Sequence, residues 1–248
     1  MEHKDYEALK RKIVPGLRFN QAIYEEVVTE HVTEQTVWLD AGCGWHVFPA
    51  WRAETEKEVA MGARLAIGCD VDLASLRQHR TLSRLVLASL EALPFRSESV
   101  SLITCNMVAE HLDRPLEVFA EFARILPPGG RVIVHTPNIY SLFVIASRLM
   151  PRSLKLRLVE RLDGRSAGDV FPTRYRANTP RTLRCLMARV GLEQERCSML
   201  TSDAALATAH PLLAAANLLY IRLTLTRALR YLRSTMLGCF VKPARRAA

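Results

Sequence analysis

Two glycines in a turn and an aspartate at the end of a second hydrophobic run are the residues of this chain best suited to chemistry. Gly42 and Gly44 follow the apolar run at 37–39 in VWLDAGCGWHVFP, and Asp70 ends LAIGCD at 65–70. Glycines let a ligand lie against the backbone, and a carboxylate accepts hydrogen bonds from both hydroxyls of a ribose. This layout is typical of a nucleotide-type site at the carboxyl edge of a parallel sheet. We therefore expect an adenosine-bearing cofactor.

The residues around the turn indicate which kind of cofactor this is. A pyrophosphate site requires a third glycine in G-x-G-x-x-G, but the letters after Gly44 are WHVF. Asp40 stands directly before the turn, where it would repel phosphate and suit a cationic or amine-bearing ligand. Both features disfavour a nicotinamide-dependent oxidoreductase, which stays as an alternative reading.

A longer stretch of the chain resembles one enzyme family. The letters DAGCG at 40–44 resemble the first motif of class I S-adenosylmethionine-dependent methyltransferases, and 85–138 resembles the middle of small-molecule members related to ubiquinone O-methyltransferases. The matches are LEALPF at 90–95, EH at 110–111 and RILPPGG at 124–130, in the family's order. The resemblance implies S-adenosylmethionine as cofactor and an α/β fold with a Rossmann-like, doubly wound, mostly parallel sheet.

The resemblance also assigns the cofactor-binding residues by their positions. The predicted set is Asp40, Ala41, Gly42 and Gly44 for the methionine end, Asp70 for the ribose, Val71, Ser89 and Leu90 for the adenine, and Asn106. Ser89 stands where the family usually has an acid, and its hydroxyl still accepts one hydrogen bond. Asp72 is the alternative to Asp70, although an N-cap of the following helix is its commoner role.

Methyl transfer asks mainly for alignment of the reacting atoms, and a base is needed when the acceptor is a hydroxyl. His111 is the candidate base because it follows the fourth predicted strand. The alternative is that Glu110 and His111 begin a helix and bond locally. Ubiquinone-type relatives hold a metal with Glu-x-x-Glu-His; Met107 replaces the first of these ligands, so we predict no metal.

The acceptor is expected to be small or lipid-like, with a hydroxyl favoured over an amine. The predicted substrate-binding residues are His46, Asn138, Tyr140, Arg174 and Tyr175, with 139–178 as a cover over the acceptor. Asn138 can equally be a turn-forming residue after a proline. A catalytically degenerate methyltransferase fold that acts as a binding subunit is a second alternative.

The hydrophobic pattern alternates strands and helices. We predict a helical lead-in at 6–30 that breaks at Pro15-Gly16; strands at 37–39, 65–69, 85–88, 101–105, 131–135, 192–199 and 235–242; and helices at 74–84, 115–126 and 180–190. One domain at 1–203 and 234–248 then carries a helical insert, 204–233, before the last strand.

The insert is strongly basic. The chain has a net charge of +9, and no acid follows residue 203. On a helical wheel Arg222, Arg227, Arg230 and Arg233 share one side, opposite leucines and an isoleucine. Two readings stay open: a basic amphipathic helix on an anionic membrane surface, or a helix packed on the domain with its arginines in water. A spanning helix is not expected, because the segment contains histidine, proline and asparagine.

Composition limits the partners and the compartment. Aromatic residues make up only 7% of the chain and no RNA-binding motif is visible, so a nucleic-acid partner is disfavoured. The six cysteines show no C-x-x-C spacing, which indicates buried thiols in a reducing compartment. The charged N-terminus lacks the apolar core of a signal peptide. We expect a cytoplasmic protein, peripheral on the inner membrane face if the insert binds lipid.

Overall fold

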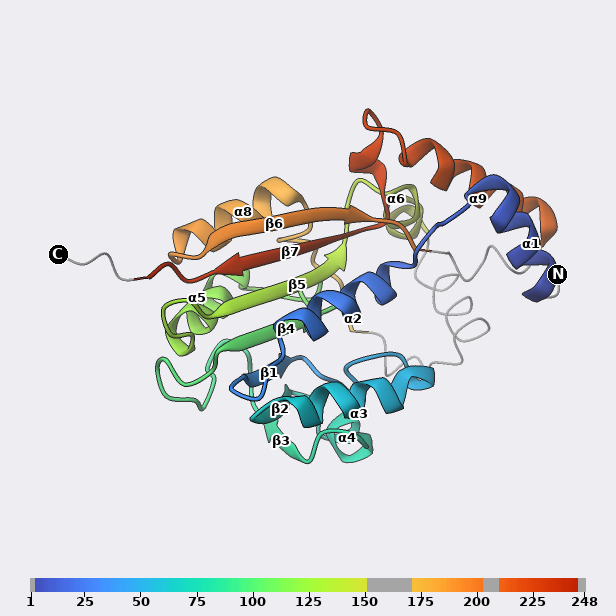
Figure 1. The fold of residues 1–248 in the computed structure, drawn as a ribbon. Coiled ribbons are helices and arrows are strands. Elements are labelled where there is room, and N and C mark those ends of the chain that lie inside the picture. Colours follow the sequence, from blue (N-terminus) through green and yellow to red (C-terminus); the bar gives the residue numbers. More distant parts are fainter. Residues whose placement is uncertain (1–2, 151–170, 203–209, 245–248) are drawn as a thin grey trace. The chain divides into compact units, whose positions relative to one another are not determined.

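The computed structural model describes residues 3–150, 171–202 and 210–244, and a seven-stranded sheet runs through them (Figure 1). The strand order is β3-β2-β1-β4-β5-β7-β6. The strands are β1 (Val37–Ala41), β2 (Leu65–Asp70), β3 (Arg84–Leu87), β4 (Leu102–Asn106), β5 (Arg131–Pro137), β6 (Glu193–Leu200) and β7 (Thr235–Val241). β1 pairs in parallel with β2 and β4, β2 with β3, and β4 with β5. The predicted α/β class with a Rossmann-like, mostly parallel sheet is confirmed.

β7 runs against β5. Hydrogen bonds join the start of β5 to the end of β7, from Gly129 N to Lys242 O, and the end of β5 to the start of β7, from Asn138 N to Ser234 O. This pattern is that of an antiparallel pair. The antiparallel strand therefore lies inside the sheet, between β5 and β6.

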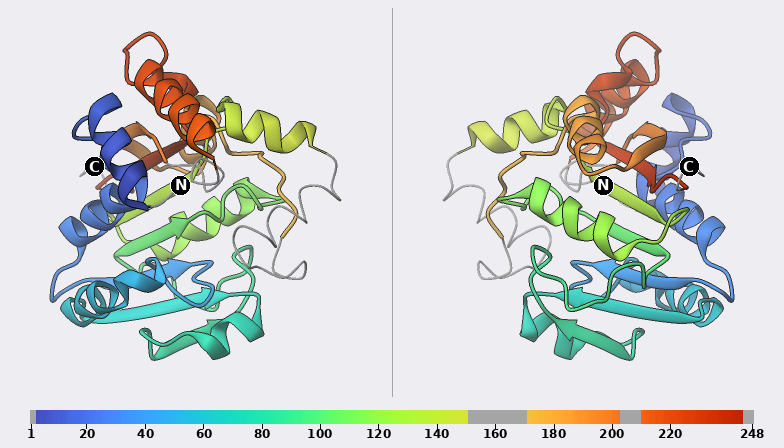
Figure 2. Two further views of the ribbon diagram at one scale, coloured as in Figure 1. Left: turned by 90° about the vertical axis from the view of Figure 1, so that its right-hand side faces the viewer. Right: turned by 90° about the vertical axis from the view of Figure 1, so that its left-hand side faces the viewer.

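Helices cover both faces of the sheet. α2 (Asn20–His31) and α3 (Ala53–Gly62) lie on one face, and α5 (Pro115–Ile125) and α8 (Pro180–Arg189) lie on the other (Figures 1 and 2). The remaining helices are α1 (His3–Ile13), α4 (Leu73–Gln78), α6 (Leu142–Leu149), α9 (Pro211–Thr224), and the short 3-10 helices η1 (Ala50–Arg52) and η4 (Arg230–Leu232). Two-sided coverage explains why the central strands are hydrophobic without alternation.

All seven predicted strands are present, with ends shifted by one or two residues, and three differences concern helices. α4 ends at Gln78 and not at residue 84, because His79 turns the chain: its backbone is extended and its Nδ1 accepts a hydrogen bond from Leu82 N at 3.3 Å. α3 and α6 were not predicted. The acids of the first turn of α3 suit a helix N-terminus, a signal that the apolar pattern alone misses.

The chain separates into two compact units. The smaller unit comprises 1–23, 137–173 and 199–236, and the larger unit comprises 24–136, 174–198 and 237–248. In the smaller unit α9 packs on α1 through Tyr6, Val14, Leu218 and Ile221. The predicted insert boundaries at 204 and 233 stay a prediction, since residue 204 lies outside the described residues.

The predicted continuous basic helix through 222–233 is wrong. α9 ends at Thr224, and a turn and η4 follow. The hydroxyl of Thr224 donates to Ile221 O at 2.8 Å, a local bond that competes with helix propagation. The guanidinium of Arg233 then donates to the carbonyl oxygens of Thr224 and Leu225, which closes the end of the helix. Within the described ranges, no helix has the length and apolar content needed to cross a membrane.

Candidate cofactor and acceptor site

The glycine turn after β1 is held by the backbone of β2. Gly42 N and Cys43 N both donate to Cys69 O, at 2.7 and 3.1 Å. Gly42 has a φ of +77°, and a Cβ added there would lie 2.4 Å from Cγ2 of Val108. Only glycine meets both conditions. Val108 therefore covers the turn at Gly42, whereas a Cβ at Gly44 would meet nothing within 4 Å.

Asp70 ties the same turn to the end of β2. Its Oδ2 accepts a hydrogen bond from Gly44 N and its Oδ1 accepts one from Asp72 N, both at 2.8 Å. The carboxylate is partly exposed, and each oxygen retains acceptor capacity for a ribose hydroxyl. Asp72 instead caps α4, accepting from the backbone N–H groups of Ala74 and Ser75. The N-cap reading of Asp72 is confirmed.

Asp40 is a buried carboxyl at the start of the turn. Asp40 is only 3% exposed. Its carboxyl accepts a hydrogen bond from the hydroxyl of Thr104, which in turn accepts one from Trp38 Nε1 at 2.8 Å. The pKa of Asp40 is raised to about 7, mainly by burial and also by the charges of Glu56 and Asp70, against the lowering effect of the hydrogen bond from Thr104. A positive group beside it would reverse that shift.

The loop after the turn is anchored by α3, which the sequence pattern did not show. Oε2 of Glu56 accepts hydrogen bonds from Val47 N at 3.1 Å and Phe48 N at 2.9 Å, and the hydroxyl of Thr81 donates to Oε1. Glu56 is thus a positioning residue that the sequence analysis missed. His46 is half-buried in this loop, and its ring lies 4.5 Å from that of the exposed Trp45.

The predicted adenine residues lie where β2 and β3 end. Ala88 N donates to Asp70 O at 3.0 Å, which brings the two strand ends together. Val71 and Ser89 are exposed and Leu90 is buried. Ser89 Oγ accepts a hydrogen bond from Glu91 N at 3.2 Å, so its hydroxyl proton remains to be donated.

Asn106 at the end of β4 is held by the buried His135 of β5. His135 Nδ1 lies 2.8 Å from Asn106 Oδ1, and the His135 ring stacks on that of Tyr24 with 5.5 Å between centroids. Burial lowers the pKa of His135 to about 4, so the neutral ring donates to the amide oxygen. Asn106 Nδ2 donates to Val47 O at 3.5 Å. Asn106 therefore links β4 to the loop that carries His46.

A second polar cluster follows β4 and contains the candidate base. Glu110 is buried, and burial raises its pKa to about 7. Its Oε2 accepts a hydrogen bond from the hydroxyl of Thr136 at 2.9 Å, and Asn178 Nδ2 donates to that hydroxyl at 2.8 Å. Nε2 of His111 lies 3.9 Å from Glu110 Oε1. Glu110 is thus the carboxyl that faces the imidazole of His111.

The backbone of Glu110 also holds the segment with two predicted substrate residues. Its carbonyl oxygen accepts hydrogen bonds from Arg174 N at 2.6 Å and Tyr175 N at 3.0 Å. The guanidinium of Arg174 forms an ion pair with Asp113 at 2.9 Å, which reduces its suitability as an anion receptor. Tyr175 is half-buried with a φ of +55°. His111, Arg174 and Tyr175 are therefore brought together through one residue.

Asn138 has a structural role that contradicts its assignment as a substrate ligand. Its amide donates to the backbone oxygens of Tyr231 at 2.7 Å and Arg233 at 2.9 Å, and its Oδ1 accepts from Tyr140 N at 3.2 Å. The residue is fully buried. These bonds use both amide protons, so turn stabilisation is the reading that the structure supports. Tyr140 belongs to the smaller unit too, and its ring is exposed.

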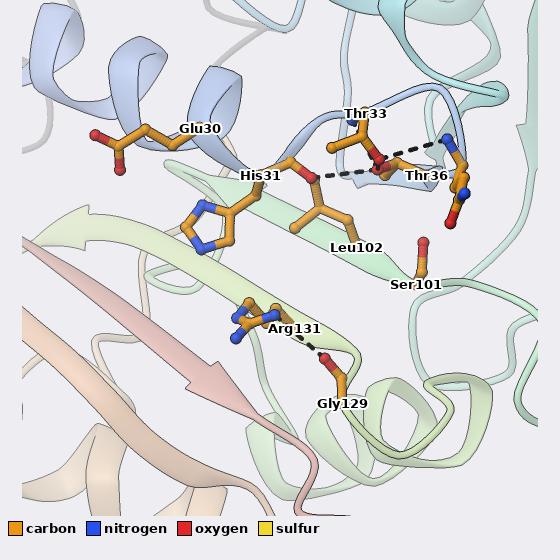
Figure 3. Close-up of a pocket in the computed structure, with 9 residues that line it drawn as sticks. Glu30, His31, Thr33, Thr36, Ser101, Leu102, Gly129 and Arg131 are labelled. Carbon is orange, nitrogen blue, oxygen red and sulfur yellow. Dashed lines mark hydrogen bonds between the residues drawn. The ribbon is translucent and has the colours of Figure 1, made fainter.

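A separate hollow lies at the opposite, amino edge of the sheet (Figure 3). Its walls include His31 and Thr36, from the end of α2 and the segment after it, and Ser101 and Arg131 at the starts of β4 and β5. Arg131 is paired there with Glu195 at 2.9 Å. Ligands of open α/β sheets bind at the carboxyl ends of strands, so this hollow is not the cofactor site.

Metal-ligating side chains do not gather in the part of the chain that the structure describes, where no three His, Cys, Asp or Glu residues form a group suited to a metal ion.

Comparison with known proteins agrees with this geometry. Residues 39–134 match the family model of a methyltransferase domain. A malonyl-[acyl-carrier protein] O-methyltransferase of Hahella chejuensis is 34% identical over 112 residues, which cover 42% of this chain and 38% of the relative. A probable S-adenosylmethionine-dependent methyltransferase of Mycolicibacterium smegmatis is 30% identical over 137 residues, 51% of this chain and 50% of the relative. The chain thus spans half or less of the length of these curated relatives.

Solved structures share the fold. An S-adenosylmethionine-dependent methyltransferase from Mesorhizobium loti has a TM-score of 0.55 at 17% identity, covering 88% of this chain and 96% of that chain. A geranyl diphosphate C-methyltransferase from Streptomyces coelicolor has a TM-score of 0.55 at 15% identity, covering 90% and 79%. The predicted resemblance to class I S-adenosylmethionine-dependent methyltransferases is confirmed: residues 39–134 match a methyltransferase domain, and these solved structures share the fold.

Proposed function

We propose that the protein transfers a methyl group from S-adenosylmethionine to an oxygen of a small or lipid-like acceptor. The observation that carries the proposal is the pair of carboxyl groups at one glycine turn, with Asp40 buried before it and Asp70 bonded to Gly44 N. A Cβ at Gly44 would meet nothing within 4 Å, so the turn has open space beside it. A cationic ligand would pair with the buried Asp40 and stabilise its ionised form.

Each residue of the turn has a role in this proposal. The backbone of Ala41, Gly42 and Gly44 binds the methionine end, and Asp40 interacts with its positive charge. Asp70 accepts from the ribose hydroxyls. Val71, Ser89 and the backbone of Leu90 contact the adenine, and Asn106 lies between the cofactor and the loop that carries His46.

The cluster after β4 supports an oxygen acceptor. When bound, S-adenosylmethionine supplies a methyl group on a sulfonium sulfur. His111 accepts the proton that an acceptor hydroxyl releases, and Glu110 orients the imidazole and stabilises its protonated form. Burial of Glu110 keeps water from this carboxyl. His46, Arg174 and Tyr175, all of the larger unit, remain the proposed acceptor contacts, and the assignment of Tyr140 stays a prediction. The name of the Hahella relative, an O-methyltransferase, agrees with an oxygen acceptor.

Isothermal titration with S-adenosylhomocysteine tests the cofactor site. We expect wild-type protein to bind, and Asp70→Ala to bind at least about tenfold more weakly, because it loses the ribose contact and the bond to Gly44. Asp72→Ala is the matched control: it removes a neighbouring carboxylate that only caps α4. Absence of binding by the wild-type protein, or equal affinities of Asp70→Ala and Asp72→Ala, would contradict the proposal.

A further inference from the structure

α9 is apolar on two opposite faces. One face, with Ala214, Leu218 and Ile221, is buried against α1. On the other side Leu212, Leu219 and Leu223 are 74%, 52% and 57% exposed. Their spacing of seven and four residues places them on one stripe of the helix. An exposed leucine stripe is costly in water, and a helix that is apolar all round is normally buried or in contact with lipid.

α6 carries a second stripe next to the first. Leu142, Ile145 and Leu149 are all exposed and follow one another at helical spacing. α6 begins beside α9, because Tyr220 Oη accepts a hydrogen bond from Leu142 N at 3.2 Å and the Tyr220 ring meets that of Phe143 edge to face (Figure 2). The two stripes therefore belong to neighbouring helices of the smaller unit.

The charged side chains on α6, on α9 and in the segment after α9 have one sign. The segments 137–150 and 210–236 contain no Asp or Glu. Arg227 and Arg230 are exposed, and so is Arg222, although its guanidinium also donates to Ile13 O at 3.2 Å. The guanidinium of Arg230 lies 4.7 Å from the centroid of the exposed Tyr231 ring. Arginine beside an aromatic ring is typical of the boundary between hydrocarbon and water. Arg233 is not part of this surface charge, since it bonds to backbone oxygens inside the unit.

We propose that the stripes on α6 and α9, with the arginines of 222–230, form a surface that docks on an anionic lipid bilayer. We call it the leucine–arginine surface. Exposed apolar side chains insert at the level of the headgroups, while the arginines pair with anionic lipid. A complementary protein would have to be strongly acidic and apolar at once, whereas an anionic bilayer presents both properties over any area. This inference rests on the proposed function, and specifically on its lipid-like acceptor. It adds the surface through which the protein would bind a bilayer that contains such an acceptor.

Vesicle sedimentation tests the surface without measuring methyl transfer. Wild-type protein should pellet with vesicles of phosphatidylcholine and phosphatidylserine in equal parts, and stay in solution with phosphatidylcholine alone. Added salt should weaken the binding. The double variant Leu219→Asp/Leu223→Asp and the double variant Arg227→Glu/Arg230→Glu should each reduce binding at least about tenfold. Leu87→Asp is the matched control, because Leu87 is 53% exposed but belongs to the larger unit.

Each variant is first titrated with S-adenosylhomocysteine, and unchanged affinity shows that the larger unit is folded. Lack of wild-type binding to anionic vesicles overturns the inference, and so does undiminished binding by either double variant. Self-association of the wild type that Leu219→Asp/Leu223→Asp abolishes, without vesicle binding, would assign the surface to a second copy of the chain and also overturn it. Vesicle binding together with no affinity for S-adenosylhomocysteine would instead contradict the proposed function alone.

Discussion

The glycine turn of the larger unit and the leucine–arginine surface of the smaller unit use their residues in opposite ways. At the turn, particular atoms have particular partners: Cys69 O accepts from two N–H groups, and Asp70 Oδ2 from Gly44 N. On the surface, several exposed leucines and arginines contribute in the same way. Each of them can be partly replaced by another. We therefore expect one substitution to disable the turn, while the surface requires several. Five predictions test the two regions.

Gly42→Ala should have the largest effect. The new Cβ would lie 2.4 Å from Val108 and would hold a positive φ, so the free energy of unfolding should fall by about 3 kcal/mol. Gly44→Ala also has a positive φ but meets nothing within 4 Å, so about 1 kcal/mol is expected. Denaturant unfolding of both variants checks the contrast. Equal losses would show that the contact with Val108 does not constrain the turn.

His111→Ala should lower kcat about a hundredfold on an oxygen acceptor, because the base is removed. Its affinity for S-adenosylhomocysteine should be unchanged. Glu110→Gln should keep part of the activity while moving the acidic limb of the pH–rate profile, since Glu110 acts through the imidazole. Retention of full turnover by His111→Ala would assign Glu110 and His111 to the structural reading.

The affinity for S-adenosylmethionine should rise with pH up to about 7, because the pKa of Asp40 is about 7 in the free protein. Below that pH a bound cation must displace a proton, which costs affinity by at most about tenfold per pH unit. Asp40→Asn should remove this dependence and bind more weakly at pH 8. Calorimetry in buffers of different ionisation enthalpy measures the released proton; a pH-independent affinity in wild-type protein would refute the coupling.

The same pKa has a consequence for stability, and its sign is opposite. Asp40 ionises near its ordinary value of 3.8 in the unfolded chain but near 7 in the folded one. The folded state therefore holds the proton more tightly, and stability declines as the pH rises through this window. Asp40→Asn should accordingly unfold at a higher temperature than wild type at pH 8, which separates its loss of affinity from a loss of folding.

Asn217→Leu should have the smallest effect, a gain of about 1 kcal/mol in the free energy of unfolding. Both polar atoms of the Asn217 amide are buried, and neither has a hydrogen-bond partner among the residues that the structure describes; leucine removes that cost. Ala216→Leu on the exposed side of α9 is the control, with unchanged stability and stronger vesicle binding expected. A destabilised Asn217→Leu would show that the amide has a role in the smaller unit.

The sequence predicted the strands and the cofactor class because both depend on local patterns. The apolar runs at 37–39 and 65–69 and the spacing of Gly42, Gly44 and Asp70 are read within short windows. The role of Glu56 was not predictable in this way, since its carboxylate bonds to Val47 and Phe48 from a helix that the apolar pattern did not reveal. The same holds for Glu110, whose partner Thr136 comes from another element and is itself bonded by Asn178.

The basic helix shows the opposite failure. A helical wheel assumes that the helix continues, and α9 ends at Thr224, where Arg233 supplies the closing hydrogen bonds from nine residues away. An arginine that serves as a cap cannot also be counted as surface charge. Arginines that lie close together in the sequence therefore have different roles in the folded chain, and the sequence alone does not distinguish these roles.

The two hydrogen bonds to Cys69 O determine which sequence changes the glycine turn can tolerate. The acceptor is a main-chain oxygen, so replacement of the Cys69 side chain leaves both donors satisfied. Insertion of a single residue into β2 would rotate that carbonyl to the other side of the strand and release the turn. A change of residue type at this position thus leaves the hydrogen bonds of the turn in place, whereas a change in strand length does not.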